Sequence, residues 1–247
     1  MRLDLYLVEN GYFSTRNKAK LAIDENKVFV NGQNKKASYE VLESDKIEVV
    51  NPNPYVSRGG YKLEGAIKEF KLDFKDKVVV DIGSSTGGFT DCALQNGAKL
   101  VYSIDVGTNH MDEKLREDKR IILMENTNIK DIDKFDNEID YLVMDVSFVS
   151  IEYLLPYIYK HINDNNALVA LIKPQFEVGN IKIKGGIVKS RTSHIKVIEN
   201  VMNELAKYNL SIYKLVKSPI LGGDGNTEYL ALIKKGINKN INILEVV

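Results

Sequence analysis

Residues 78–90 read VVVDIGSSTGGFT, an apolar strand that runs through a turn of small residues into the start of a helix. Small residues in such a turn let a ligand approach the backbone, and the helix N-terminus offers free N–H groups. The glycine spacing matches neither the dinucleotide fingerprint G-x-G-x-x-G nor a phosphate loop that ends in Lys-Ser or Lys-Thr. The stretch therefore predicts a site for a ligand without a pyrophosphate.

Strand and helix patterns alternate outward from this turn. Short strands rich in Val and Ile are expected at 77–82, 99–105, 120–124, 139–145 and 167–173. Helices are expected at 88–96, 111–118, 150–162 and 191–208. Such alternation is typical of an α/β fold with a doubly wound parallel sheet. Two more strands, near 210–217 and 228–234, flank a glycine-rich turn and are expected to form an antiparallel pair at a sheet edge.

A second carboxylate supports a ligand at the glycine-rich turn. Asp105 ends the next expected strand, 24 residues after Asp81. In a doubly wound sheet this position can bind the two hydroxyls of a ribose. Together with Gly83 and Gly87, the two aspartates suit an adenosyl ligand. The alternative is a tight strand-to-helix turn that binds nothing.

Four more polar residues lie at the ends of expected elements on the same side of the sheet. Asp145 and Lys173 end two strands. Lys62 lies near the start of a helix before the first strand, and Glu228 opens the last strand. Folds of this class place their chemistry at the carboxyl ends of parallel strands. Each residue alone could be a helix cap, a solvated charge or part of a surface ion pair, but a lysine that ends an apolar strand is poorly placed to reach water.

The first fifty residues predict a separate small unit. Two short helices, the second capped by Ser14 or Thr15, precede a hairpin signal at Asn31-Gly32 and a final strand at 45–50. Two prolines then predict a linker, because each excludes helix at its own position. The expected organisation is a small α+β domain at 1–50, a linker at 51–57 and the α/β domain at 58–247.

Composition favours a soluble cytoplasmic protein. The chain has 247 residues, of which 44% are hydrophobic and 28% charged, and its one cysteine excludes an internal disulfide. The longest apolar run, Ala167–Ile172, is far shorter than the roughly 18 residues that span a bilayer. Asp4 and Glu9 stand where a signal peptide needs an apolar run. No membrane partner and no disulfide scaffold are expected.

The net charge of zero hides an asymmetry along the chain. Residues 105–164 carry seven Lys/Arg and fourteen Asp/Glu, whereas residues 165–217 carry nine and three. Such blocks can build one positive face that suits a polyanion. Interleaving of the charges on the folded surface is the alternative.

Several separated segments, in order, resemble one known family. The first fifty residues resemble the S4 RNA-binding domain through Arg2-Leu3-Asp4, Ser14-Thr15-Arg16, residues 27–32 and Asp45-Lys46-Ile47. The remainder is similar to a ribose 2′-O-methyltransferase of the FtsJ/RrmJ type. With the segments SRGGYKL, DIGSSTGGFTD, DVSFVSI, KPQFEVG and GNTEY, the whole resembles the TlyA family of ribosomal RNA methyltransferases, often labelled haemolysin A.

The resemblance implies a Rossmann-like sheet of seven strands with the last pair antiparallel, S-adenosylmethionine as cofactor, and a set of site residues. The catalytic tetrad would be Lys62, Asp145, Lys173 and Glu228. The cofactor would be held by Asp81, Gly83, Ser84, Ser85, Thr86, Gly87, Gly88, Phe89, Asp105, Asn128 and Asp145. The linker of the family couples its two domains, but here Pro54-Tyr55-Val56 lacks the arginine and tryptophan found in other members.

Transfer of a methyl group to a ribose 2′-hydroxyl requires positioning and the removal of one proton. A free lysine, with a pKa near 10.4, is a poor base at pH 7. A second lysine and the cofactor's sulfonium would favour the neutral amine, while the two carboxylates would oppose this effect. The hypothesis is that Lys173 takes the proton, that Asp145 and Glu228 orient the two lysines, and that Lys62 holds the acceptor nucleotide.

The RNA is expected to contact basic residues of both domains, which are Arg2, Arg16, Lys18, Lys20, Lys27, Arg58, Lys182, Lys184, Lys189 and Arg191. Phosphate contacts of this kind give salt-dependent affinity and little sequence information. For any single lysine, a solvated basic surface is the alternative.

The predicted function is methylation of a cytidine ribose in 23S rRNA, with 16S rRNA as a further target in some relatives. The short ends of the chain favour the 50S subunit as partner, and the 30S subunit stays open. No metal is expected, because His110, His161 and His194 are scattered. The rival functions are a non-catalytic ribosome assembly factor and a pore-forming haemolysin.

Overall fold

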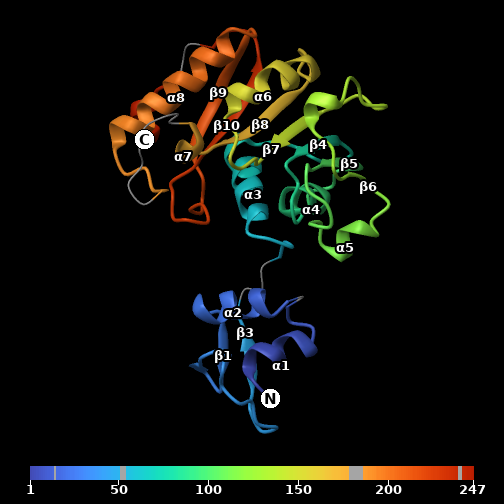
Figure 1. Ribbon diagram of the computed structural model, residues 1–247, viewed down its shortest axis with the longest axis vertical. Coiled ribbons are helices and arrows are strands. Elements are labelled where there is room, and N and C mark those ends of the chain that lie inside the picture. Colours follow the sequence, from blue (N-terminus) through green and yellow to red (C-terminus); the bar gives the residue numbers. More distant parts are fainter. Residues whose placement is uncertain (14, 51–53, 178–185, 239–240) are drawn as a thin grey trace. The chain divides into compact units, whose positions relative to one another are not determined.

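The chain folds into two compact units, Met1–Pro54 and Tyr55–Val247, in a computed structural model (Figure 1). The structure describes residues 1–13, 15–50, 54–177, 186–238 and 241–247. Tyr55 is only 7% exposed and packs into the core of the second unit, so residues 55–57 of the expected linker lie in that unit.

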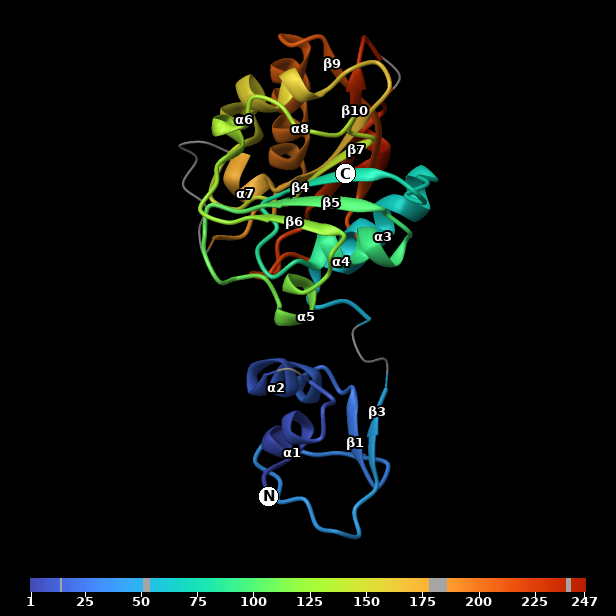
Figure 2. The same ribbon diagram turned by 90° about the vertical axis from the view of Figure 1, so that its right-hand side faces the viewer.

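The first unit has two helices on one side of a small antiparallel sheet (Figure 2). The helices are α1 (Leu3–Glu9) and α2 (Arg16–Asp24), and the strands, in the order β2-β1-β3, are Gln33–Asn34, Val28–Val30 and Ile47–Val49. The Thr15 hydroxyl caps α2 by accepting the N–H of Lys18. Asn31 and Gly32 both adopt positive φ, which closes the predicted hairpin with Val30 opposite Gln33. The predicted small α+β domain is confirmed.

The second unit is built on one seven-stranded sheet in the order β6-β5-β4-β7-β8-β10-β9. Its strands are β4 (Val78–Ile82), β5 (Leu100–Ile104), β6 (Ile121–Met124), β7 (Tyr141–Met144), β8 (Ala167–Ile172), β9 (Leu210–Lys217) and β10 (Tyr229–Lys235). The first five are parallel, and β10 is antiparallel to both of its neighbours. The predicted fold is confirmed, with β10 inserted inside the sheet and β9 at its edge.

Helices cover both faces of this sheet (Figures 1 and 2). One face carries α3 (Gly59–Phe70), α4 (Gly88–Gln95) and α5 (Glu113–Arg116), and the other carries α6 (Ile151–Ile158) and α8 (Arg191–Ala206). The short elements are η1 (Ile129–Asp131), η2 (Tyr159–His161), α7 (Pro174–Glu177) and α9 (Ile243–Val246).

Side-chain alternation along the central strand produces the two layers. Val78, Val80 and Ile82 of β4 face the core shared with α6 and α8, and Val79 faces the core shared with α3 and α4. Both faces are buried, so the strands read as continuous apolar runs. Among the described helices, none is long and apolar enough to cross a membrane.

The strand order reverses direction at β4. The chain proceeds from β4 outward to β5 and β6, then returns to place β7 on the other side of β4. Ligands of doubly wound sheets bind at such a switch point, beyond the carboxyl ends of the strands. The residues predicted for chemistry follow these strand ends.

The close approach of Tyr55 to α3 predicts a stability effect. A β-carbon at Gly60 would lie 2.2 Å from Cγ of the Tyr55 ring, so we expect Gly60→Ala to lower the free energy of unfolding. The cost should be about 1–3 kcal/mol, the usual penalty for overpacking a core. Gly223→Ala is the control, because nothing lies within 4 Å of that β-carbon. Equal denaturant midpoints for the two variants would contradict the packing.

Candidate active site

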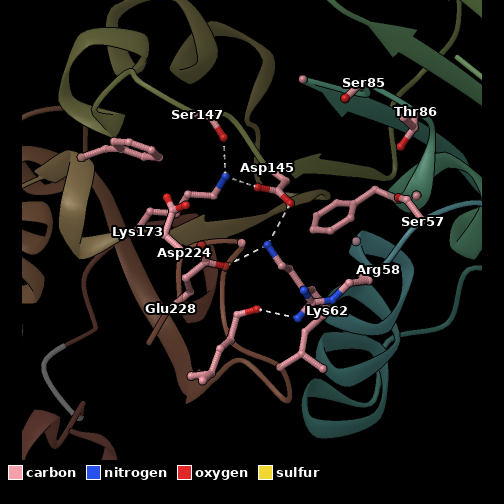
Figure 3. Close-up of a pocket in the computed structure, with 18 of the residues that line it drawn as sticks. Ser57, Arg58, Lys62, Ser85, Thr86, Asp145, Ser147, Lys173, Asp224 and Glu228 are labelled. Carbon is pink, nitrogen blue, oxygen red and sulfur yellow. Dashed lines mark hydrogen bonds and ion pairs between the residues drawn. The ribbon is translucent and has the colours of Figure 1, made fainter. Parts of the chain in front are cut away.

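A cavity of about 360 Å³ lies at the switch point, beyond the ends of β4, β7 and β8 (Figure 3). It is lined by the glycine-rich turn, by the residues that follow β7 and β8, by the start of α3 and by the loop before β10. All four predicted tetrad residues line it. The structure thus brings the predicted catalytic residues and part of the predicted cofactor loop to one site.

The four tetrad residues form a row of alternating charge (Figure 3). Lys62 Nζ lies 2.8 Å from Glu228 Oε2 and 3.3 Å from Asp145 Oδ2. Asp145 Oδ1 lies 2.5 Å from Lys173 Nζ. Asp145 therefore bridges the two lysines, and the ion pair of Glu228 in this row is with Lys62.

Burial makes this pairing necessary. Lys62, Lys173 and Glu228 are 8%, 6% and 2% exposed. A buried charge without a partner is costly, but the row holds two cations and two anions in contact and so sums to zero. The row is a stable arrangement of groups that could otherwise not remain charged there.

Four separate elements deliver these side chains. Lys62 lies in the first turn of α3. The start of this helix packs closely on α4, since a β-carbon at Gly88 would lie 3.0 Å from the main-chain nitrogen of Gly60. Asp145 and Lys173 directly follow β7 and β8. Glu228 precedes β10, and a β-carbon at Gly222 would lie 2.4 Å from its Oε1, so a side chain at Gly222 would displace the Glu228 carboxylate.

The glycine-rich turn wraps around a carboxylate. Asp105, directly after β5, accepts N–H groups from Ser85 and Gly107, both at 2.7 Å. Gly83, Ser85 and Gly87 adopt positive φ, which for Ser85 is an uncommon conformation. The carboxylate therefore holds the turn in shape.

Asp81 lies beneath this turn. Its Oδ2 accepts the hydroxyl of Thr90 at 2.6 Å, and burial raises the pKa of the carboxyl to about 7. Within the described part of the chain, Asp81 Oδ1 and Ser84 Oγ are buried and have no hydrogen-bond partner. Unsatisfied polar atoms beside a turn of small residues fit a polar ligand such as the adenosyl and amino-acid groups of S-adenosylmethionine.

The predicted cofactor residues divide into two groups. Seven of them line the cavity, namely Gly83, Ser84, Ser85, Thr86, Gly88, Phe89 and Asp145. Asp81 lies below the turn, Gly87 faces Met111 and Leu115, and Asp105 supports the turn from behind. Asn128 caps η1 by accepting the N–H of Lys130, and its contact with the adenine stays a prediction.

Among the cavity residues to which the sequence reasoning gave no role, Ser147 and Phe148 stand out. Lys173 Nζ donates to Ser147 Oγ at 2.9 Å, which extends the charged row by one hydroxyl. Phe148 is 88% exposed at positive φ, and its ring lies 5.1 Å from that of Phe176. Both residues lie in the segment DVSFVSI, which carries part of the resemblance, but that segment gave a role only to Asp145.

The predicted RNA-binding residues have different surroundings. In the first unit, Arg2, Arg16 and Lys20 surround Asp4, Lys27 pairs with Glu25, and Lys18 is half-buried. In the second unit, Arg58 lines the cavity and donates to Leu221 O, Lys189 is exposed, and Arg191 donates to the main-chain oxygens of Leu244 and Val247. Lys182 and Lys184 lie outside the described residues.

In the described ranges, no group of three or more His, Cys, Asp or Glu residues is arranged to hold a metal ion.

Comparisons with known proteins identify the families that both units resemble. Residues 55–235 match the model of the FtsJ-like methyltransferase family, and residues 1–47 match that of the S4 domain. The chain is 44% identical to hemolysin A of Brachyspira hyodysenteriae, over 94% of this chain and 98% of that protein. It is 37% identical to the 23S rRNA (cytidine-2′-O)-methyltransferase TlyA of Campylobacter jejuni, over 93% and 97%.

A solved structure has the same fold over the whole chain. The "putative hemolysin from Streptococcus thermophilus" superposes with a TM-score of 0.78 at 38% identity, covering 100% of this chain and 94% of that one.

The raised pKa of Asp81 predicts a pH effect on the stability of the cofactor-free protein. An unfolded aspartate titrates near 3.9, so between about pH 4 and pH 7 the folded state binds more protons and the free energy of unfolding falls as pH rises. Asp81→Asn should flatten this decline. Denaturant titrations at pH 5 and pH 7.5 measure it, and Asp136→Asn, at an exposed position, is the control. Parallel pH profiles for wild type and Asp81→Asn would contradict the prediction.

Proposed function

The chain belongs to the TlyA (hemolysin A) family of proteins with an S4 and an FtsJ-like methyltransferase domain, and on this premise we propose that it methylates a ribose 2′-hydroxyl of ribosomal RNA. The observation that carries the proposal is the row Glu228–Lys62–Asp145–Lys173 beside the glycine-rich turn. A cytidine of 23S rRNA is the proposed target, since that is the stated substrate of the Campylobacter relative. Such a substrate places the protein in the cytoplasm.

S-adenosylmethionine, when bound, supplies an electrophilic methyl group on a sulfonium. The residues predicted to hold it are those of the glycine-rich turn with Asp81, Asp105 and Asn128. The proposed transfer is a displacement in which the 2′-oxygen forms a bond to the methyl carbon, the carbon–sulfur bond breaks, and the 2′-proton leaves.

In this proposal Lys173, a cation in the ion-paired row, first releases one proton to solvent, which the added positive charge of the bound sulfonium favours, and the neutral amine then accepts the 2′-proton. Asp145 Oδ1 and Ser147 Oγ hold its Nζ from two sides, which fixes the direction of the nitrogen lone pair. Lys62 Nζ uses two of its three donors on Asp145 and Glu228 and retains one for a ribose oxygen. Asp145 thus couples the base to the residue that positions the acceptor.

Substitution of the proposed base tests the reaction. We expect Lys173→Ala to lower methyl transfer at least about a hundredfold, the lower range for losing a general base. The measurement is transfer of labelled methyl from S-adenosylmethionine to unmethylated 50S and 30S subunits, with the product mapped as one ribose that resists alkaline cleavage. Lys68→Ala, an exposed lysine of the helix that carries Lys62, is the matched control.

The outcomes separate the rival functions. Label on one subunit, lost in Lys173→Ala and retained in Lys68→Ala, supports the proposal and identifies the subunit. Cofactor binding without label on either subunit would exclude both subunits as substrates. Absence of cofactor binding would support a ribosome assembly factor, and dose-dependent leakage from liposomes would support a haemolysin.

The exposed Phe148 predicts a separate effect on RNA. Phe148 has a positive backbone φ, and its exposed ring lines the cavity. A ring in this position can stack on a base that has been extruded from the RNA. Stacking of this kind contributes about 1–3 kcal/mol per base. Phe148→Ala should therefore weaken RNA use about fivefold or more while leaving cofactor affinity unchanged, as measured by kcat/KM for RNA and by calorimetry. Phe148→Tyr, which keeps the ring, should retain activity.

A further inference from the structure

A buried carboxylate in the first unit takes no part in the active site. Asp4, the second residue of α1, is 0% exposed, and its N–H donates to Ala37 O at 3.1 Å. Burial of an ionised carboxylate is costly unless several donors compensate it. The groups around Asp4 therefore explain why an acid is placed there.

Three cations converge on this carboxylate. Arg2 donates from Nε to Oδ1 at 3.0 Å and from a terminal nitrogen to Oδ2 at 3.2 Å. Arg16 donates to Oδ2 at 2.9 Å, and Lys20 Nζ lies 3.9 Å from the same oxygen. Arg16 and Lys20 are one turn apart on α2, which packs against α1 (Figure 2).

The carboxylate stays ionised over the working range of pH. Hydrogen bonds from Arg2, assisted by Arg16, lower the pKa of Asp4 to about 2. The cluster therefore keeps three positive charges and one negative charge.

The cations face outward although their anchor is buried. The side chains of Arg2, Arg16 and Lys20 are 40%, 48% and 44% exposed. A guanidinium has five N–H donors, of which Arg2 uses two and Arg16 one on Asp4, so several remain for a second anion. An excess of two positive charges with free, oriented donors suits the phosphates of a nucleic-acid backbone.

We propose that Asp4 is a positioning residue that holds Arg2, Arg16 and Lys20 as a preformed binding site for RNA phosphates. The proposal rests on the proposed function, because it takes ribosomal RNA as the ligand. Ordering a long cationic side chain costs conformational entropy, and the buried carboxylate removes that cost before RNA binds.

Substitution of Asp4 separates this role from simple electrostatics. Asp4→Asn removes one negative charge and so raises the net charge by one unit. Net charge alone therefore predicts tighter RNA binding. Positioning predicts the opposite, because an asparagine cannot accept both hydrogen bonds from Arg2 and leaves Arg16 less constrained. Glu48→Gln is the matched control, since it makes the same change of charge at an exposed ion pair with Lys46.

The experiment measures the affinity of the full chain for 23S rRNA over a range of salt concentrations. For Asp4→Asn we expect a Kd raised roughly tenfold, the effect of losing one charge-assisted contact, and a shallower dependence of log Kd on log salt. At saturating RNA, kcat and cofactor affinity should match wild type. Glu48→Gln should bind as wild type or more tightly.

The opposing outcomes are distinct. A folded Asp4→Asn variant that binds RNA as tightly as wild type with the same salt dependence would overturn the positioning role. If the wild type itself shows no salt-dependent binding to rRNA, the proposed function fails instead.

A second measurement covers the case in which Asp4→Asn does not fold. In the wild type, the Arg2 Nε–H should give a single NMR signal that exchanges slowly with solvent before RNA is added, because it is bonded to a buried oxygen. Fast exchange of that proton in the free protein would overturn preformation.

Discussion

Asp145 shares its two carboxylate oxygens between two buried lysines, and the arrangement of the second unit depends on this contact. Neither lysine could remain charged at such low exposure without an anion, and removing one partner of a buried pair commonly costs about 3–5 kcal/mol. The contact also requires α3, the end of β7 and the end of β8 to meet at one point. Because that point lies at the switch point of the sheet, the contact also fixes the position of the cavity.

The reversed direction of β10 follows from the same constraint. Tyr229 pairs with Ile172, so Glu228, one residue before β10, stands at the edge of the sheet where the neighbouring β8 ends in Lys173. A parallel strand at that position would begin at the opposite edge and carry its first residues away from the cavity. Antiparallel insertion therefore supplies the second anion of the row, which balances the second cation. The topology of the sheet and the neutrality of the site are linked.

The same physics separates what the sequence could predict from what it could not. Apolar runs that stop at Asp145 and Lys173 predict strand ends, and strand ends of a parallel sheet share one edge, so these two residues could be brought together without coordinates. The tetrad as a set came from the resemblance to a known family. Hydrogen bonds to particular oxygens depend on tertiary distances of a few tenths of an ångström, so the bridging by Asp145 and the contact with Ser147 could not be predicted. The positive φ of Phe148 could not be predicted either, because the residue that usually indicates such a conformation is glycine.

The two units use carboxylates in opposite ways, and the difference follows from exposure. In the second unit no side chain of the row is more than 18% exposed, so each cation needs an anion in contact, and the site can act only on a group that enters it. In the first unit only the anion is buried, so Asp4 can hold more positive charge than it neutralises. An unbalanced cluster is tolerable only where water or a polyanion reaches its outer face. The excess charge is thus itself an argument that this face binds an anion, independent of any resemblance to other proteins.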